Sequence, residues 1–219
     1  MNSCLEMSNS VKNRLTYLRS TGFIPRTALD IGAYEGYYSI GFKSIFPEST
    51  MYMIEANHDK RQHLEKTGFS YSISLLSDKN KIVPFYKYIG TETSYTTGNS
   101  VYKENSKYYQ DEKCLVENIK STTLSDFVRD NKIENIDFIK MDVQGSEKDI
   151  VLGGVSVIRD CKYVQLEISI VEYNAKSPLI YEMFELMKTL GFSVNDILEV
   201  HYIDGRLIQM DILFKNDNK

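Results

Sequence analysis

Hydrophobic residues in this chain occur in short runs of two kinds, separated by glycines and polar turns. Continuous or alternating apolar runs predict strands, and apolar residues spaced three or four positions apart predict helices. The two kinds alternate along most of the chain. Strands are predicted at residues 27–31, 51–56, 70–76, 136–141 and 163–170, and helices at 10–18, 37–46, 59–66, 123–129, 146–152 and 179–190.

The remaining apolar runs predict two hairpins. One joins residues 81–89 to 114–120 across a polar inserted loop, 90–113, and the other joins 192–200 to 207–215. The pattern predicts an α/β fold with a mostly parallel seven-stranded sheet, helices on both faces and a C-terminal antiparallel hairpin. A length of 219 residues favours a single domain, 1–219, that begins with a helical segment, 1–26.

A glycine-containing turn follows the first predicted strand. Asp30, Gly32 and Gly36 stand where the strand gives way to a helix, and glycine lets the backbone turn tightly and approach a ligand. Glu55 ends the second strand 19 residues after the last glycine, the place of an acid that binds ribose hydroxyls. The G-x-x-x-G spacing lacks the paired early glycines that admit a pyrophosphate. It therefore favours a cofactor with a ribose and no phosphates over NAD.

Composition excludes several classes of function. With 26 basic and 30 acidic residues the net charge is -4 and no basic stripe is visible, so nucleic acid is not the expected partner. The three cysteines and three histidines show no metal-ligand spacing, so no disulfide framework and no metal site are predicted. His58 and His63 are expected on the surface. No apolar run reaches the roughly 20 residues of a membrane span, and a cytoplasmic location is expected.

Five segments resemble one enzyme family. Residues 30–36 resemble the first motif of Rossmann-like methyltransferases, and residues 139–147 with 151–154 resemble the K-x-D-V-E-G-x-E…L-x-G signature of FkbM-type methyltransferases. Further matches follow the family's order at 75–78, 121–127 and 210–214, so the resemblance covers roughly residues 27–215. The departures are Gln144 for the family's Glu, Ser146 for Ala, Ala56 for Pro, and Tyr34-Glu35 in the glycine turn.

The resemblance implies a Rossmann-like class I methyltransferase fold and S-adenosyl-L-methionine as cofactor. Glu55 would hold the ribose. Asp30 would orient the glycine turn and accept from the cofactor's amino group, directly or through water, or it would simply cap the turn. Ser77 and Asp78 would lie near the adenine or form a plain turn. The expected cofactor-binding residues are Asp30, Gly32, Ala33, Gly36, Tyr37, Glu55, Asn57, Ser77, Asp78 and Asp142.

The acceptor of the methyl group is expected to be a hydroxyl of a saccharide or other small natural product. Asp142, Glu167 and His201 are the candidates for a base, because they follow or end strands at the same edge of the sheet. Lys140 is expected on the opposite strand face from Asp142, as a packed lysine.

Two other functions remain open from the sequence. The chain could be an NAD-linked oxidoreductase on the same fold, or a catalytically silent cofactor-binding module, for which Gln144 is the motivating residue. The loop 90–113 is either an acceptor-binding lid or a surface excursion. The oligomeric state is not indicated.

Overall fold

The computed structural model describes residues 6–90, 93–106, 109 and 111–219. Its helices are α1 (Asn9–Ser20), α2 (Tyr37–Ile45), α3 (Arg61–Thr67), α4 (Leu124–Asp130), α5 (Glu147–Gly153), α6 (Val155–Asp160) and α7 (Ile180–Thr189), with short 3-10 turns η1 (His58–Lys60), η2 (Thr93–Gly98) and η3 (Asp111–Lys113). Its strands are β1 (Thr27–Ile31), β2 (Thr50–Glu55), β3 (Ser70–Ile73), β4 (Leu75–Leu76), β5 (Ile82–Tyr88), β6 (Cys114–Thr122), β7 (Ile136–Met141), β8 (Tyr163–Ser169), β9 (Phe192–Ile203) and β10 (Arg206–Asn216).

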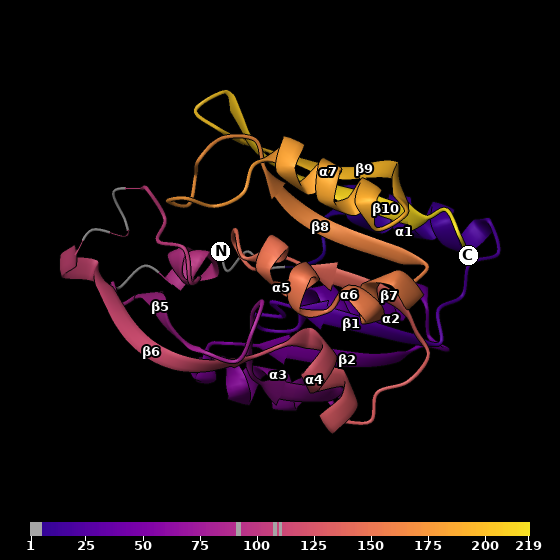
Figure 1. Cartoon of the computed structure of the whole chain (residues 1–219), viewed down its shortest axis with the longest axis horizontal. Helices are drawn as coiled ribbons and strands as arrows, with labels where there is room; N and C mark the ends of the chain where they lie inside the picture. Colours follow the sequence, from indigo (N-terminus) through magenta and orange to yellow (C-terminus); the bar gives the residue numbers. More distant parts are fainter. Residues whose placement is uncertain (1–5, 91–92, 107–108, 110) are drawn as a thin grey trace.

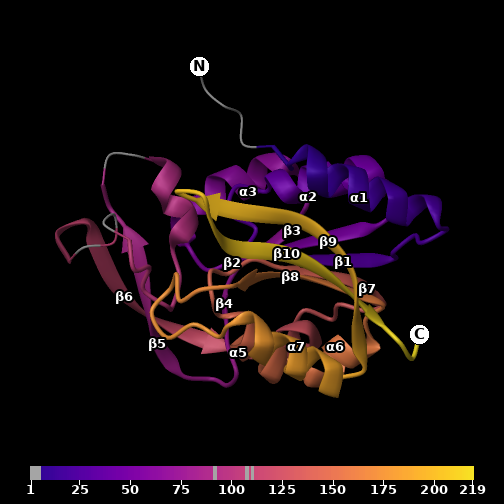
Figure 2. The ribbon, with the colours of Figure 1, turned by 90° about the horizontal axis from the view of Figure 1, so that it is seen from above.

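A seven-stranded sheet forms the centre of the molecule, in the order β3-β2-β1-β7-β8-β10-β9. Neighbouring strands are parallel from β3 to β8, and β10 runs antiparallel to both β8 and β9. Figure 2 shows α1, α2 and α3 on one face of this sheet and α5, α6 and α7 on the other. This arrangement is the predicted mostly parallel sheet with a C-terminal antiparallel hairpin.

Strands β1 and β7, at the centre of the sheet, are buried along their whole length because helices cover both faces of the sheet. Successive side chains of a strand point to opposite faces, so each strand serves two cores. Ile139 and Met141 of β7 pack in the core beneath α5, α6 and α7, whereas Phe138 packs in the core beneath α1 and α2. Residues 138, 140 and 142 thus share the α1–α2 face, which decides where the polar side chains of β7 lie.

A second sheet, β4-β6-β5, projects from the edge of the first (Figure 1). The predicted strand 70–76 is divided between the two sheets. Residues up to Ile73 pair with β2, and Leu75 and Leu76 pair with Ser121 and Thr122 of β6. The sequence pattern does not reveal this change of partner, because both halves form strand. The predicted hairpin of residues 81–89 and 114–120 corresponds to β5 and β6.

The predicted helix of residues 146–152 corresponds to α5, which ends at Gly153 with Gly154 as its C-cap residue. A further helix, α6, which the sequence pattern did not predict, begins at Val155 directly after the two glycines. A Cβ on Gly153 would lie 2.1 Å from the carbonyl oxygen of Ser77, and one on Gly154 would lie 2.6 Å from Leu124. Close packing of α5 against β4 and α4 therefore requires the two glycines.

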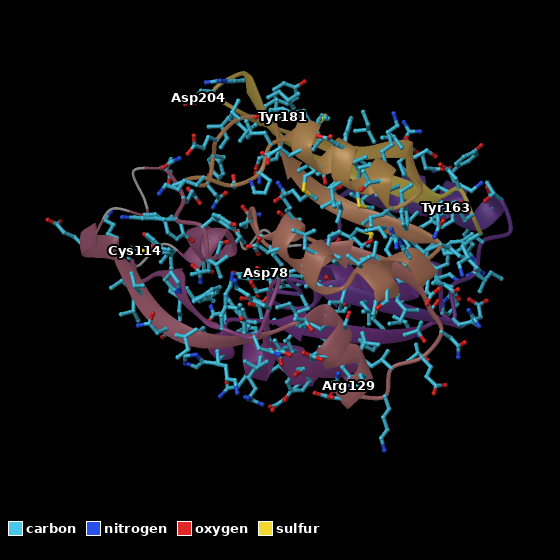
Figure 3. All side chains as sticks on the ribbon, viewed as in Figure 1. Asp78, Cys114, Arg129, Tyr163, Tyr181 and Asp204 are labelled. Carbon is cyan, nitrogen blue, oxygen red and sulfur yellow. The ribbon has the colours of Figure 1, made fainter. Side chains whose placement is uncertain are left out.

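The C-terminal hairpin is longer than predicted, because β9 extends to Ile203. Figure 3 shows Asp204 at its outer tip and Cys114 at the far end of the small sheet. His58 and His63 are exposed, as expected. Within the part of the chain that the structure describes, no helix has both the length and the apolar character needed to cross a bilayer.

Candidate active site

The loops after β1, β2 and β7 meet at one edge of the large sheet and enclose a cavity of about 280 Å³. Ligands of open α/β sheets bind at this edge, outside the carboxyl ends of the strands. The segment before α1, the insert between β5 and β6, and strands β8, β9 and β10 complete the walls. The polar or loop residues that line the cavity include Gly32, Ala33, Tyr34, Tyr37, Glu55, Asn57, Asp142, Gln144, Gln165, Glu167, Glu199, His201 and Asp211.

The turn after β1 requires glycine at its first position. Gly32 has a φ of 77°, and a Cβ on it would lie 1.9 Å from the carbonyl oxygen of Asp142. The turn therefore passes directly over the end of β7. Gly36 has another role, since a Cβ there would lie 2.8 Å from Thr67 and the residue does not line the cavity. Of the two motif glycines, only Gly32 lines the cavity.

Lys140 lies beneath the glycine turn, and the prediction that it faces away from Asp142 was wrong. Its buried ammonium group lies 3.3 Å from Asp30 and 3.5 Å from Asp142, and it donates to the carbonyl oxygen of Gly32 at 3.1 Å. Residues two apart on a strand point to the same face, which brings the two side chains together. Burial acts to lower the pKa of Lys140, but the charges of Asp30 and Asp142 raise it above its ordinary value.

Asp30 is fully buried and does not line the cavity. Its carboxylate accepts from the hydroxyl of Ser39 at 2.6 Å and faces Lys140 on its other side. In this geometry Asp30 is not placed for the direct contact with a cofactor that was one of its expected roles. Asp30 instead holds Lys140, which in turn holds the glycine turn.

Glu55 ends β2 with its carboxylate in the cavity wall. One oxygen accepts from the backbone N–H of Tyr34 at 2.8 Å, and the other accepts from that of Asn57 at 2.7 Å. Burial raises the pKa of Glu55, in opposition to these backbone hydrogen bonds. A carboxylate has about four lone-pair sites, so each oxygen keeps acceptor capacity for a ligand hydroxyl.

Ser77 and Asp78 do not line the cavity. The hydroxyl of Ser77 donates to Asp78 at 3.0 Å, and Asp78 forms an ion pair with Lys81 at 2.5 Å. The lining residues of this segment are Leu75 and Leu76. These leucines form an apolar wall against which a flat ring can pack. Residues 75–78 therefore border the cavity through Leu75 and Leu76, and not through Ser77 and Asp78 as expected.

An amide joins the two carboxylates on the opposite side of the cavity. The amide nitrogen of Gln144 donates to Asp142 at 2.9 Å and to Glu167 at 2.6 Å, and that of Gln209 donates to the same oxygen of Glu167 at 3.0 Å. Burial raises the pKa of Glu167 well above its ordinary value, and the charge of Asp142 adds to the rise. Burial also acts to raise the pKa of Asp142, but Lys140 outweighs it and the pKa is lowered. Gln144 therefore holds together two carboxylates that would otherwise repel each other.

His201 reaches the cavity from β9 and contacts Asp211 on β10. Its Nε2 atom lies 2.8 Å from Asp211 and 3.8 Å from Glu167. The hydrogen bond to Asp211 raises the pKa of His201, against the opposing effect of burial. Asp142, Glu167 and His201, the three expected candidates for a base, are thus close together. Sequence reasoning missed Asp211 as a site residue, and its only signal was its place in the motif segment 210–214.

The described part of the insert forms one wall of the cavity. The hydroxyl of Ser100 lies 2.9 Å from the carbonyl oxygens of both Val143 and Gln144, and the hydroxyls of Tyr34 and Thr96 lie 2.7 Å apart. Residues 91–92, 107–108 and 110 of the predicted loop lie outside the described residues. The insert therefore touches the loops after both β1 and β7. Its lining residues are Thr96, Thr97, Asn99, Ser100 and Val101.

Comparison with solved structures identifies the class of fold. Similar structures include TrmK of M. capricolum in complex with S-adenosyl-homocysteine, which is 12% identical over 96% of this chain and 69% of that chain, with a TM-score of 0.51. Magnesium protoporphyrin IX methyltransferase (ChlM) from Synechocystis PCC 6803 with bound SAM is 8% identical over 95% and 78%, with a TM-score of 0.54. The 1,6-didemethyltoxoflavin-N1-methyltransferase of Burkholderia thailandensis, with bound 1,6-didemethyltoxoflavin and S-adenosylhomocysteine, is 8% identical over 95% and 78%, with a TM-score of 0.50. The chain has the fold of the class I methyltransferases.

The family follows from the sequence. The model of the methyltransferase FkbM domain matches residues 30–194, and the chain belongs to this family. No curated protein matches the chain in sequence. The cofactor expected from the glycine turn, S-adenosyl-L-methionine, is consistent with the molecules bound in the three solved structures.

Proposed function

We propose that this protein is an S-adenosylmethionine-dependent methyltransferase that acts on a hydroxyl of a saccharide or another small natural product. One observation carries the proposal: Glu55, at the end of β2, shares a single cavity with the acid–amide cluster of Asp142, Gln144 and Glu167. Glu55 suits the ribose of the cofactor. The acid–amide cluster suits an acceptor with several hydroxyls, because carboxylates accept hydrogen bonds and amides both donate and accept them.

The β1–β2 side of the cavity fits the cofactor. Glu55 has acceptor capacity for two ribose hydroxyls, and Gly32 and Ala33 bring the backbone to the cavity without bulk. Leu75 and Leu76 offer the apolar wall for adenine. When bound there, the cofactor supplies an electrophilic methyl group on a sulfonium centre. Asn57 and Tyr37 also line this side and complete the proposed binding site.

The acceptor would lie between Asp142 and His201. Methyl transfer to oxygen requires alignment of the acceptor oxygen and a route for its proton. Asp142 is tied to Lys140 and Gln144 and is suited to positioning. Glu167 and His201 line the cavity on the side of β8 and β9, where they can contact an acceptor and take part in removing its proton.

Two measurements test the proposal. Isothermal titration should show one S-adenosylhomocysteine bound per chain and no binding of NAD. Incubation with S-adenosylmethionine and a panel of sugars, hydroxylated natural products and amines should then yield O-methyl products by mass spectrometry. Binding of NAD in place of S-adenosylhomocysteine would indicate an oxidoreductase. Methylation of amines alone would contradict the assignment of an oxygen acceptor.

A further inference from the structure

Three potential metal-binding atoms converge on the acceptor side of the cavity. They are an oxygen of Glu167 on β8, Nε2 of His201 on β9 and an oxygen of Asp211 on β10, and all lie within 4.8 Å of one another. Nε2 of His201 is 2.8 Å from Oδ2 of Asp211 and 3.8 Å from Oε1 of Glu167. Strand pairing fixes this arrangement, since Asp211 stands directly opposite Glu167 and Gln209 opposite His201.

The second oxygen of each carboxylate is held by glutamine amides. Oε2 of Glu167 accepts from Gln144 and Gln209, and Oδ1 of Asp211 accepts from Gln165 at 2.9 Å. Gln165 is itself fixed by the hydroxyl of Tyr38, which donates to it at 2.6 Å. Neutral hydrogen-bond partners of this kind orient the carboxylate ligands of metal sites. They leave Oε1 of Glu167 and Oδ2 of Asp211 directed toward His201.

The charges around these atoms are unbalanced. Of the residues that the structure describes, six carboxylate side chains line the cavity, and Lys140 is the only lysine or arginine that does so. The ion pairs of Lys140 go to Asp30 and Asp142, and the charge of Asp211 acts on it from beyond ion-pair distance. A divalent cation would balance the excess negative charge at this point.

We propose that Glu167, His201 and Asp211 bind a first-row divalent cation such as Mn²⁺ or Zn²⁺. One imidazole nitrogen with two carboxylate oxygens is a donor set that these ions accept, and three protein ligands leave a position open, as in catalytic sites. Ligand atoms at about 2.1 Å from one ion lie about 3 to 4.3 Å apart, so the observed separations need only small side-chain movements. The inference goes against the sequence expectation of no metal site, because these residues share no local motif.

A metal ion at this site would take part in the proposed methyl transfer, and its suggested role rests on that proposed function. An acceptor hydroxyl at the open position would lose its proton to solvent more readily, because a bound cation lowers the pKa of an oxygen ligand. The acceptor oxygen then forms its bond to the methyl carbon as the carbon–sulfur bond breaks, and that electron pair remains on sulfur. The products are a methyl ether and S-adenosylhomocysteine, with no oxidant or reductant involved.

The test is binding of the metal alone. Protein dialysed against EDTA and then freed of chelator is titrated with MnCl₂ or ZnCl₂ by calorimetry, and Mn²⁺ binding is followed by electron paramagnetic resonance. We expect one ion per chain, and at least a tenfold loss of affinity in Asp211→Asn, Glu167→Gln and His201→Ala. Asp196→Asn is the matched control, since Asp196 lies on the same strand as His201 but faces Arg14.

Absence of binding, or equal affinity in the three variants and the control, would overturn the metal site. Melting curves of each variant establish that it is folded before the comparison. Titration of S-adenosylhomocysteine into the same metal-free samples separates this inference from the proposed function. Cofactor binding without metal binding rejects only the metal site, and loss of both in wild-type protein rejects the two together.

Discussion

The ammonium group of Lys140 lies 3.3 Å from the carboxylate of Asp30, and both are buried beneath the turn that carries Gly32. Lys140 also reaches Asp142 and the carbonyl oxygen of Gly32. One cation therefore ties β1, β7 and the glycine turn together. Lys140 lines the cavity, whereas Asp30 lies beneath it and does not.

Replacement of Lys140 by Met should lower the free energy of unfolding by about 3–5 kcal/mol, because it leaves buried carboxylates without their partner. The double variant Lys140→Met/Asp30→Asn should be more stable than the sum of the single changes predicts. Urea unfolding of the four proteins measures the coupling. Lys148→Met, which removes an ion pair with Glu182 at the surface, should cost less than about 1 kcal/mol. Strict additivity would show that Lys140 and Asp30 are not coupled.

Glu55→Gln should weaken binding of S-adenosylhomocysteine by roughly 1.5 to 3 kcal/mol, about ten- to a hundredfold. The reason is the loss of charge-assisted hydrogen bonds to the ribose, together with one of the backbone contacts to Tyr34 and Asn57. Calorimetry provides the measurement. The exposed Glu48, which pairs with Arg19, supplies the control variant Glu48→Gln, whose affinity should equal that of the wild type. Unchanged affinity in folded Glu55→Gln would place the ribose elsewhere.

Asp142→Asn should lower cofactor affinity and the single-turnover rate together, each by about tenfold or more. The carboxylate of Asp142 is bound to Lys140 and Gln144, so its removal disturbs the glycine turn as well as the acceptor side. Asp160→Asn, at a largely exposed site, should change neither quantity. A rate loss of about a hundredfold with wild-type affinity would instead identify Asp142 as a general base.

The stability of the protein should carry a pH dependence from Glu147. Burial raises the pKa of Glu147 to about 7 from its ordinary 4.5, although backbone N–H groups of Val143 and Gly145 donate to it. Between these two values the folded state holds a proton that the unfolded chain releases. Its contribution to stability is therefore present below about pH 4.5 and is lost as the pH rises through 7, by roughly 1.4 kcal/mol per pH unit.

The variant Glu147→Gln isolates this contribution. Its free energy of unfolding relative to the wild type should rise by about 2–3 kcal/mol between pH 5 and pH 7.5, since only the wild type has to ionise a buried acid. Urea unfolding at both values gives the difference. Glu185→Gln, at an exposed position of α7, should show a constant difference. A constant difference for Glu147→Gln as well would mean that Glu147 ionises normally in the folded protein.

Local sequence patterns were sufficient for most of the helices and strands and for the first part of the site, although they missed α6 and the division of residues 70–76 between two sheets. The glycine turn and Glu55 could be predicted because a turn type and the end of a strand are properties of a few consecutive residues. The parallel sheet also followed from short apolar runs alternating with helical periodicity. The family signature around Asp142 similarly marked the end of β7 before any contact was known.

Tertiary structure decided the contacts between strands. Asp211 meets Glu167 and His201 only because β10 inserts between β8 and β9, and no short motif records that pairing. Leu75 and Leu76 replaced Ser77 and Asp78 in the cavity wall because the strand changes sheets after Ile73. The sequence by itself determined which strand ends carry acids, since that depends on local order. Strand order and side-chain direction decide which of those acids touch and which amide or lysine contacts them. Both are set only when the sheet assembles.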